Sequence, residues 1–305
     1  MKRTIFSLAL LLMITSLLLA QTPASQTPQQ APGAAAQRGA RGGGGGGGRG
    51  RGGNPQRKVL LAWADTRNGV SQHAFTTHAL AIVERLGYES GMWDTFIRTD
   101  SNIIANAAFK TDGTPASGGP SLSNVDGIFF LGHREIEMNA KQKEELLTFV
   151  RNGHGFVLAH TGLTAFESWP EFGEMVGAQY GGHLYTGPAK VINESPTSPM
   201  TKHFAAEFDY NDEFYSAKTW SRNKVDVLLR FNPLSVSGTE LAKDGDFPLA
   251  WIKKYGTGRV FYGSFSHGTE LWDRRDIQLM YLEAIKWSLG ITDTEPKPHP
   301  IVKSN

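Results

Sequence analysis

From Lys58 onward, short runs rich in β-branched and aromatic residues alternate with stretches whose apolar residues recur at helical spacing. The runs VLLAWA (59–64) and VDGIFFLG (125–132) are almost wholly apolar, which is typical of strands buried on both faces of a sheet. Between them, the stretch from 73 to 87 has a helical stripe and ends at Gly87, a predicted helix C-cap. Strands that alternate with helices predict an α/β domain with a mostly parallel central sheet.

The second part of this domain also predicts helices and strands. A helix with Asn139 as N-cap and Gly153 after its last turn leads into the strand GFVLA, which ends at His160. Further on, FPLAWIKKYGTGRVFYGSF predicts two strands joined by a tight hairpin at Gly256 and Gly258. A last helix closes the domain, which we place at residues 58–291, followed by a C-terminal tail at 292–305.

The first twenty residues have the pattern of a secretory signal. Lys2 and Arg3 precede the apolar stretch IFSLALLLMITSLLLA, which is short for a membrane span. We predict a signal peptide at 1–20, cleaved after Ala20, and hence a secreted or periplasmic protein without a transmembrane span after cleavage. The alternative is an uncleaved N-terminal anchor.

Residues 21–57 consist mainly of Gln, Pro, Ala, Gly and Arg, and predict a disordered linker. Its arginines, spaced by glycines, also resemble segments that bind nucleic acid, although a solvated tether is favoured on an exported chain. Residues 1–57 hold seven basic residues and no acidic one, which leaves 24 basic against 29 acidic residues from Lys58 onward. We therefore expect no nucleic-acid binding by the folded domain.

Four polar residues follow or interrupt the predicted strands. In α/β sheets, ligands bind outside the carboxyl ends of the strands, where His160 and His267 are placed. His183 follows two glycines in QYGGHLYTG, and Glu213 stands beside Asp212 in NDEFY. Imidazole and carboxylate groups suit proton transfer and metal ligation. Each has a structural explanation on its own, but together they predict a catalytic group of His160, His183, Glu213 and His267, with the three histidines as candidate metal ligands.

Several segments in order along the whole folded region resemble the ThuA-like family, which is named for a trehalose-utilisation protein. They are QKEELLTFVRNGHGFVLAHTG, GGHLY, SPMTKHF, DEFY, PLAWIKKYGTGRVFYGSFSHG and IKWSLG. The most specific piece is the run W-x-x-x-Y-G-x-G-R-V-F-Y that ends in Ser266 and His267, and His73 stands at the family's early histidine position.

This resemblance implies a class I glutamine amidotransferase-like fold, which is a flavodoxin-like three-layer sandwich, and a role in sugar metabolism. Amidotransferases with that fold carry a cysteine at the elbow, the sharp turn from a strand into a helix, and His160 occupies the corresponding position here. The chain contains no cysteine, so glutaminase chemistry through a thioester is excluded. Disulfide bonds are excluded for the same reason.

Three hypotheses about the function remain open. The first is an enzyme, a hydrolase, lyase or isomerase, acting on a small-molecule carbohydrate or keto-sugar derivative. It would use either a divalent metal such as zinc held by the imidazoles, or a histidine and Glu213 that move a proton next to a keto group. The alternative is a non-catalytic carbohydrate-binding or scaffolding module, in which the histidines would lie apart. RNA binding through the linker is a third hypothesis.

Overall fold

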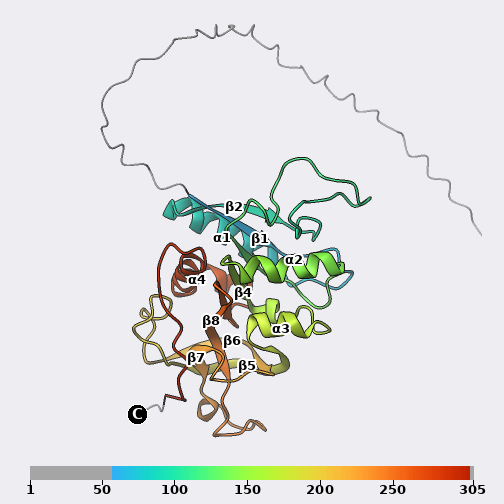
Figure 1. Ribbon diagram of the computed structural model, residues 1–305. Coiled ribbons are helices and arrows are strands. Elements are labelled where there is room, and N and C mark those ends of the chain that lie inside the picture. The colour runs from blue at the N-terminus through green and yellow to red at the C-terminus, as the bar shows by residue number, and fades with distance from the viewer. Residues whose placement is uncertain (1–56, 303–305) are drawn as a thin grey trace, which may run out of the picture. The chain divides into compact units, whose positions relative to one another are not determined.

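The computed structural model describes residues 57–302, and its strands form a single sheet (Figure 1). The strands are β1 (Lys58–Trp63), β2 (Trp93–Arg98), β3 (Gly127–Phe130), β4 (Gly155–Ala159), β5 (Gln179–Asn193), β6 (Glu207–Lys218), β7 (Asp226–Phe231), β8 (Pro248–Tyr255) and β9 (Gly258–Gly263). The α-helices are α1 (Thr76–Ser90), α2 (Ala140–Arg151), α3 (Pro170–Val176) and α4 (Arg275–Ser288). Short 3₁₀ helices are η1 (His160–Thr164), η2 (Pro233–Ser235) and η3 (Thr269–Asp273).

The sheet is mixed, with the strand order β2-β1-β3-β4-β9-β8-β7-β5-β6. The pairs from β2 to β9 are parallel, and the pairs from β9 to β6 are antiparallel. The prediction of a mostly parallel, flavodoxin-like three-layer sandwich is therefore wrong. The reason lies in the connections: parallel neighbours need a long crossover, usually a helix, whereas the described chain has no α-helix between α3 and α4.

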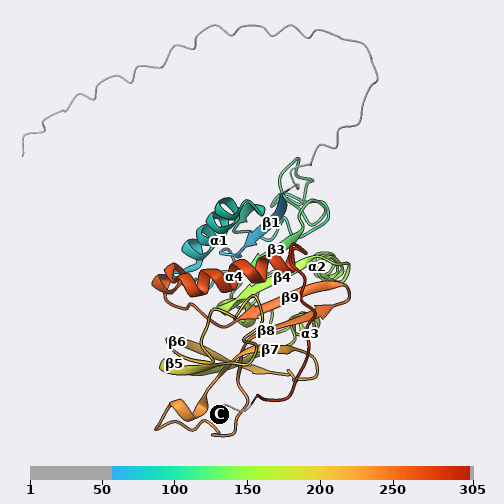
Figure 2. The same cartoon turned by 90° about the vertical axis from the view of Figure 1, so that its left-hand side faces the viewer.

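Helices cover both faces of the parallel half of the sheet. Alternate residues of β1 divide between the faces: Leu60 and Ala62 belong to the core under α1 and α4, and Leu61 and Trp63 to the core under α2 and α3. Figures 1 and 2 show the two pairs of helices on opposite sides. Because every side chain of such a strand meets a packed layer, the strand is apolar along its length.

Local signals in the sequence are mostly confirmed. Asn139 caps α2 in a capping box with Gln142, and Gly256, at φ 61°, turns the hairpin between β8 and β9. The predicted C-cap at Gly87 is wrong, because α1 continues to Ser90 and Gly91 is the left-handed cap. A Cβ at Gly87 would lie 2.4 Å from the indole nitrogen of Trp93, so the glycine lets the Trp93 ring pack directly against the main chain of α1.

The C-terminal segment has no helix or strand up to residue 302, yet it is bound to β7. The main-chain N–H of Lys297 donates to the buried carboxylate of Asp226 at 2.8 Å. The guanidinium of Arg230, which also pairs with buried Glu194 at 2.6 Å, donates to the carbonyl of Val302 at 3.3 Å. These bonds fix the segment against the antiparallel half of the sheet.

The predicted signal peptide at 1–20 lies outside the described residues, as do the linker at 21–57 except its last residue and the end of the tail at 292–305. Among residues 57–302, no helix combines the length and apolar character needed to cross a membrane.

Candidate functional site

His160 stands at the elbow where β4 passes into η1, and its ring is fully buried. Its Nδ1 lies 2.8 Å from the carbonyl oxygen of Ser264, and the ring stacks on Tyr215 at a centroid distance of 4.2 Å. Because a carbonyl oxygen only accepts, Nδ1 must carry the proton. In the neutral imidazole this leaves the lone pair on Nε2, the atom that faces Glu213.

Glu213 is the centre of the site. Its Oε2 lies 3.4 Å from Nε2 of His160 and 3.6 Å from Nε2 of His267, and its Oε1 lies 3.3 Å from Nε2 of His183. Glu213 lies on β6, which is the last strand in the sheet order. A hydrogen bond connects this strand to the segment after β9, because the main-chain N–H of Tyr215 donates to the Ser264 hydroxyl. The structure thus brings together all four residues that the sequence predicted as catalytic.

A further histidine, His73, enters from the loop between β1 and α1. One ligand atom each of His73, His160, Glu213 and His267 lies within 4.8 Å of the others. The candidate ligand set therefore includes His73, which sequence reasoning had noted only for its place in the family. A long loop separates it from the end of β1, so the strand-end position that pointed to His160 and His267 does not point directly to His73.

His183 lies beside this group rather than in it. Its side chain is 54% exposed, and its Nδ1 lies 3.1 Å from the hydroxyl of Tyr180. The imidazole of His183 is therefore exposed to solvent next to the group, and the Tyr180 hydroxyl is its hydrogen-bond partner.

The elbow after β9 is held by Asp212, the neighbour of Glu213. Its carboxylate accepts the main-chain N–H of Ser266 at 2.6 Å and that of His267 at 3.0 Å. Ser266 has φ 80° and His160 has φ 37°, so both elbows use the left-handed region that non-glycine residues rarely adopt. Such strain is maintained by surrounding contacts and is concentrated at functional sites.

The protonation states favour ligation. Burial, together with the neighbouring imidazoles of His133, His160 and His267, lowers the pKa of His73 to about 4. The contact with His160 lowers the pKa of Glu213 to about 2 against the opposing effect of burial, and His267 adds to the decrease. At neutral pH His73 is neutral and Glu213 is charged, which are the forms that bind a metal.

Two separations within this group are close to those between ligands of one divalent cation. Zinc ligands at roughly 2.0–2.1 Å from the ion lie about 3.3–3.4 Å apart in a tetrahedral shell. The separations from Glu213 Oε2, 3.4 Å to His160 and 3.6 Å to His267, match this spacing. Nε2 of His160 and Oε2 of Glu213 are also buried without a hydrogen-bond partner among the described residues. A cation between them would satisfy both atoms, and imidazole and carboxylate suit zinc and several other divalent ions.

The sequence profile of the ThuA family, described as trehalose utilisation, matches residues 58–288. The chain belongs to the ThuA family. Among solved structures, a ThuA-like protein from Bacteroides uniformis is 20% identical, with a TM-score of 0.61 over 76% of this chain and 91% of that one. Another from Parabacteroides merdae is 16% identical, with a TM-score of 0.59 over 79% and 92%. At these identities the likeness shows the ThuA fold alone. No curated protein sequence matches the chain.

Proposed function

We propose that this ThuA-family domain is a metal-dependent enzyme that acts on a sugar or keto-sugar derivative. The observation that carries the proposal is the pair of buried atoms, His160 Nε2 and Glu213 Oε2, which face each other at 3.4 Å and have no hydrogen-bond partner within residues 57–302. If His160 were an imidazolium donating to the carboxylate, the two atoms would lie at about 2.7–2.9 Å. The longer separation supports two ligands of one cation.

His73, His160, His267 and Glu213 would hold the ion, which supplies Lewis-acid polarisation of a carbonyl or activation of water. Four protein ligands fill a tetrahedral shell. A substrate atom can join only if the ion accepts five or six ligands, as an expanded zinc or an octahedral ion does. The His267 side chain is 43% exposed, so the open side of the group faces solvent.

His183 is the proposed proton-transfer residue. It contacts Glu213 Oε1 at 3.3 Å and the Tyr180 hydroxyl at 3.1 Å, so its ring is oriented while its exposed edge can reach a substrate. Residues of this kind exchange protons with a reacting group as general acid or base. Asp212 acts on the site indirectly, because it fixes the main chain of His267.

The class of substrate rests on the family, whose profile is described as trehalose utilisation. The convergence of the imidazoles supports an enzyme over a non-catalytic carbohydrate-binding module, for which we expected the histidines to lie apart. The signal-like pattern of residues 1–20 supports action in the periplasm or outside the cell.

Metal analysis of the full chain, purified without chelator, tests the proposal. We expect about one divalent ion per chain in the wild type, and its loss in Glu213→Gln, which removes the anionic ligand. Asp209→Asn is the matched control, because Asp209 lies on the same strand but its side chain is 85% exposed and pairs with Lys190.

Activity is then measured on trehalose and on keto-sugar glycosides, before and after chelation and after metal is restored. We expect turnover that follows metal content. A Glu213→Gln variant that keeps the ion, or a chelated protein that retains full activity, would contradict the assignment.

A further inference from the structure

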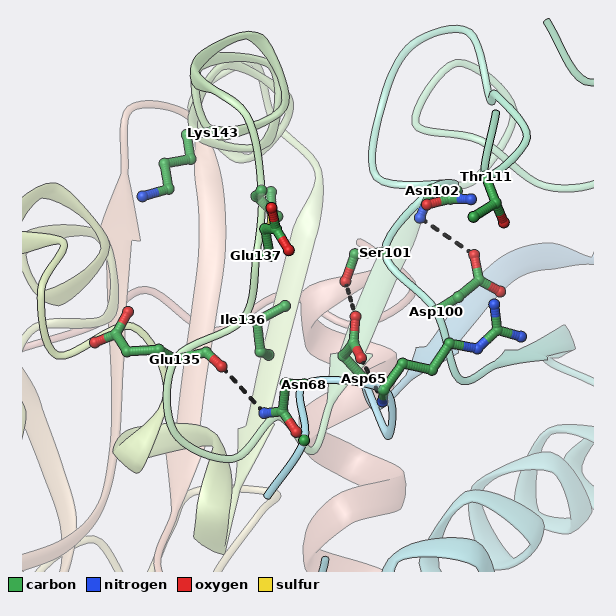
Figure 3. Close-up of a pocket in the computed structure, with 13 residues that line it drawn as sticks. Asp65, Asn68, Asp100, Ser101, Asn102, Thr111, Glu135, Ile136, Glu137 and Lys143 are labelled. Atoms are coloured by element: carbon green, nitrogen blue, oxygen red, sulfur yellow. Dashed lines mark hydrogen bonds between the residues drawn. The ribbon is translucent and has the colours of Figure 1, made fainter. Parts of the chain in front are cut away.

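A polar cavity of about 720 Å³ lies at the same edge of the sheet as the histidines. It is lined by the loops that follow β1, β2 and β3 and by Lys143 of α2 (Figure 3). Because β2 and β3 lie on opposite sides of β1, the chain reverses its direction across the sheet at β1. In open α/β sheets, ligands bind at such a switch point.

The acceptor groups of the cavity are fixed in place. Asp65 accepts the main-chain N–H of Arg67 at 2.8 Å and the hydroxyl of Ser101. Asp100 accepts the main-chain N–H of Asn102 at 3.2 Å and the guanidinium of Arg98 at 2.7 Å. These bonds hold both carboxylates without using all their acceptor capacity, since each oxygen has two lone pairs. Figure 3 shows both carboxylates among the lining side chains.

Other lining groups are free to bind. The side chains of Asn102 and Glu137 make no hydrogen bond or ion pair within residues 57–302, and Lys143 contacts the Trp169 ring with its ammonium but pairs with no carboxylate there. The cavity therefore offers amide, carboxylate and ammonium groups. Ile136 and Met138 are its apolar side chains.

Size and charge indicate the class of ligand. The volume falls within the range of about 300–1,000 Å³ that is typical of small-molecule sites. The lining carboxylates are those of Asp65, Asp100, Glu135 and Glu137, and the lining basic groups are those of Arg67 and Lys143. The guanidinium of Arg98 pairs with Asp100 at 2.7 Å, which leaves three carboxylates against two basic groups, so the cavity disfavours an anion. Neutral hydroxyl groups can donate to the carboxylates and accept from the ammonium and amide groups.

Hydrogen bonds connect the lining of the cavity to the loop next to the metal-ligand group. The Asn68 amide, which lines the cavity, donates to the main-chain carbonyls of His133 at 2.6 Å and Glu135 at 3.1 Å. The His133 ring lies 4.8 Å from the ring of His73. A ligand in the cavity therefore lies next to the loops that carry the proposed metal site.

We propose that this cavity is a subsite for a neutral sugar ring of the substrate, recognised through its hydroxyl groups. The proposal rests on the proposed function and narrows it: the substrate has at least two sugar units, one at the metal-ligand group and one in the cavity. The ring in the cavity is not the reacting one and sets specificity.

The test uses the metal-loaded full chain and three neutral disaccharides: trehalose, maltose and sucrose. The methyl signal of Met138, assigned by its absence in Met138→Leu, reports on the cavity by NMR. We expect at least one disaccharide to shift this signal with saturation. Asn102→Ala/Glu137→Ala should weaken that binding about tenfold, as expected for the loss of two hydrogen-bonding groups.

The matched control is Asn223→Ala/Glu240→Ala, which removes an exposed amide and carboxylate away from the cavity and should leave the affinity unchanged. Glucuronate should bind more weakly than the neutral sugar. The proposal is overturned if none of the disaccharides shifts the Met138 signal, if the cavity variant binds as tightly as the control, or if glucuronate binds best.

A variant without the metal site separates the two proposals. Glu213→Gln should retain the sugar-dependent shift of Met138 while it loses the ion. If the wild type also binds no metal and the sugar still shifts the Met138 signal, the proposal of a metal-dependent enzyme is refuted, whereas the proposal of a sugar subsite is supported.

Discussion

Replacement of His160 by asparagine tests the metal site with little change to the fold. The amide nitrogen of the shorter side chain can take the place of imidazole Nδ1 and donate to the Ser264 carbonyl, which the native ring does at 2.8 Å. Asparagine also tolerates the left-handed backbone, φ 37°, better than most residues. The atom that is lost is Nε2, the one that faces Glu213.

The structure sets the size of the two effects. Loss of the stacking on Tyr215 removes about 0.5–1.5 kcal/mol, and relief of backbone strain offsets part of it. The metal-free variant should therefore unfold within roughly 2–4 °C of the wild type, which corresponds to about 1 kcal/mol in a domain of this size. Outer partners of metal ligands contribute about 10–100-fold to affinity, so loss of a direct ligand should exceed about 100-fold, or about 2.7 kcal/mol.

The assay combines calorimetric titration of zinc, cobalt and manganese with thermal unfolding. At an ion concentration about 100 times its Kd, the wild type should gain about 2.7 kcal/mol of stability, and His160→Asn should gain almost none. His154→Asn is the matched control, because His154 is partly buried and its Nδ1 contacts a carbonyl, that of Phe149, at 3.0 Å. Equal metal affinity in His160→Asn and the wild type would refute the ligand assignment.

Three further predictions concern the surroundings of the ion. His183→Ala should leave the metal content unchanged and lower kcat by about 10²–10⁴-fold, measured on the metal-loaded enzyme; unchanged kcat would rule out its role in proton transfer. Asp212→Ala should weaken metal binding about 10–100-fold in competition with a chromogenic chelator, because the main chain of His267 loses its acceptor. A metal affinity equal to that of the wild type would show that Asp212 is not needed to position His267. Urea unfolding should show the metal-free protein losing stability as the pH falls from 6.5 towards 4. The pKa of His73 is about 4 in the fold and 6.5 when unfolded, so the unfolded chain binds more protons in this range. His73→Gln should flatten this dependence, and an unaltered slope would contradict it.

Local sequence patterns predicted many of the helices and strands, but they did not predict how the strands of the second half pair. The apolar run before His160 and the capping signal at Asn139 report burial and helix starts directly. Whether two strands pair in parallel depends on what connects them, and the long stretch between α3 and α4 carries no helical period. Gly87 shows a related limit, since a glycine that ends a helix and one that admits the Trp93 ring look alike in sequence.

The site was more predictable than the sheet around it. His160 and His267 were selected because each follows a strand, His183 because two glycines precede it, and Glu213 because it forms an acidic pair with its neighbour. The structure gathers all four. His73 was not selected, because a long loop separates it from β1 and nothing in the sequence shows that this loop folds back. Its place in the ligand set is a property of tertiary structure.

The bonds between the C-terminal segment and β7 link folding to the late stages of synthesis. Until Lys297 has left the ribosome, the buried carboxylate of Asp226 lacks its main-chain donor, and Arg230 lacks the carbonyl of Val302. A product that ends before Lys297 lacks both of these bonds, so we expect β7 to be less stable in it.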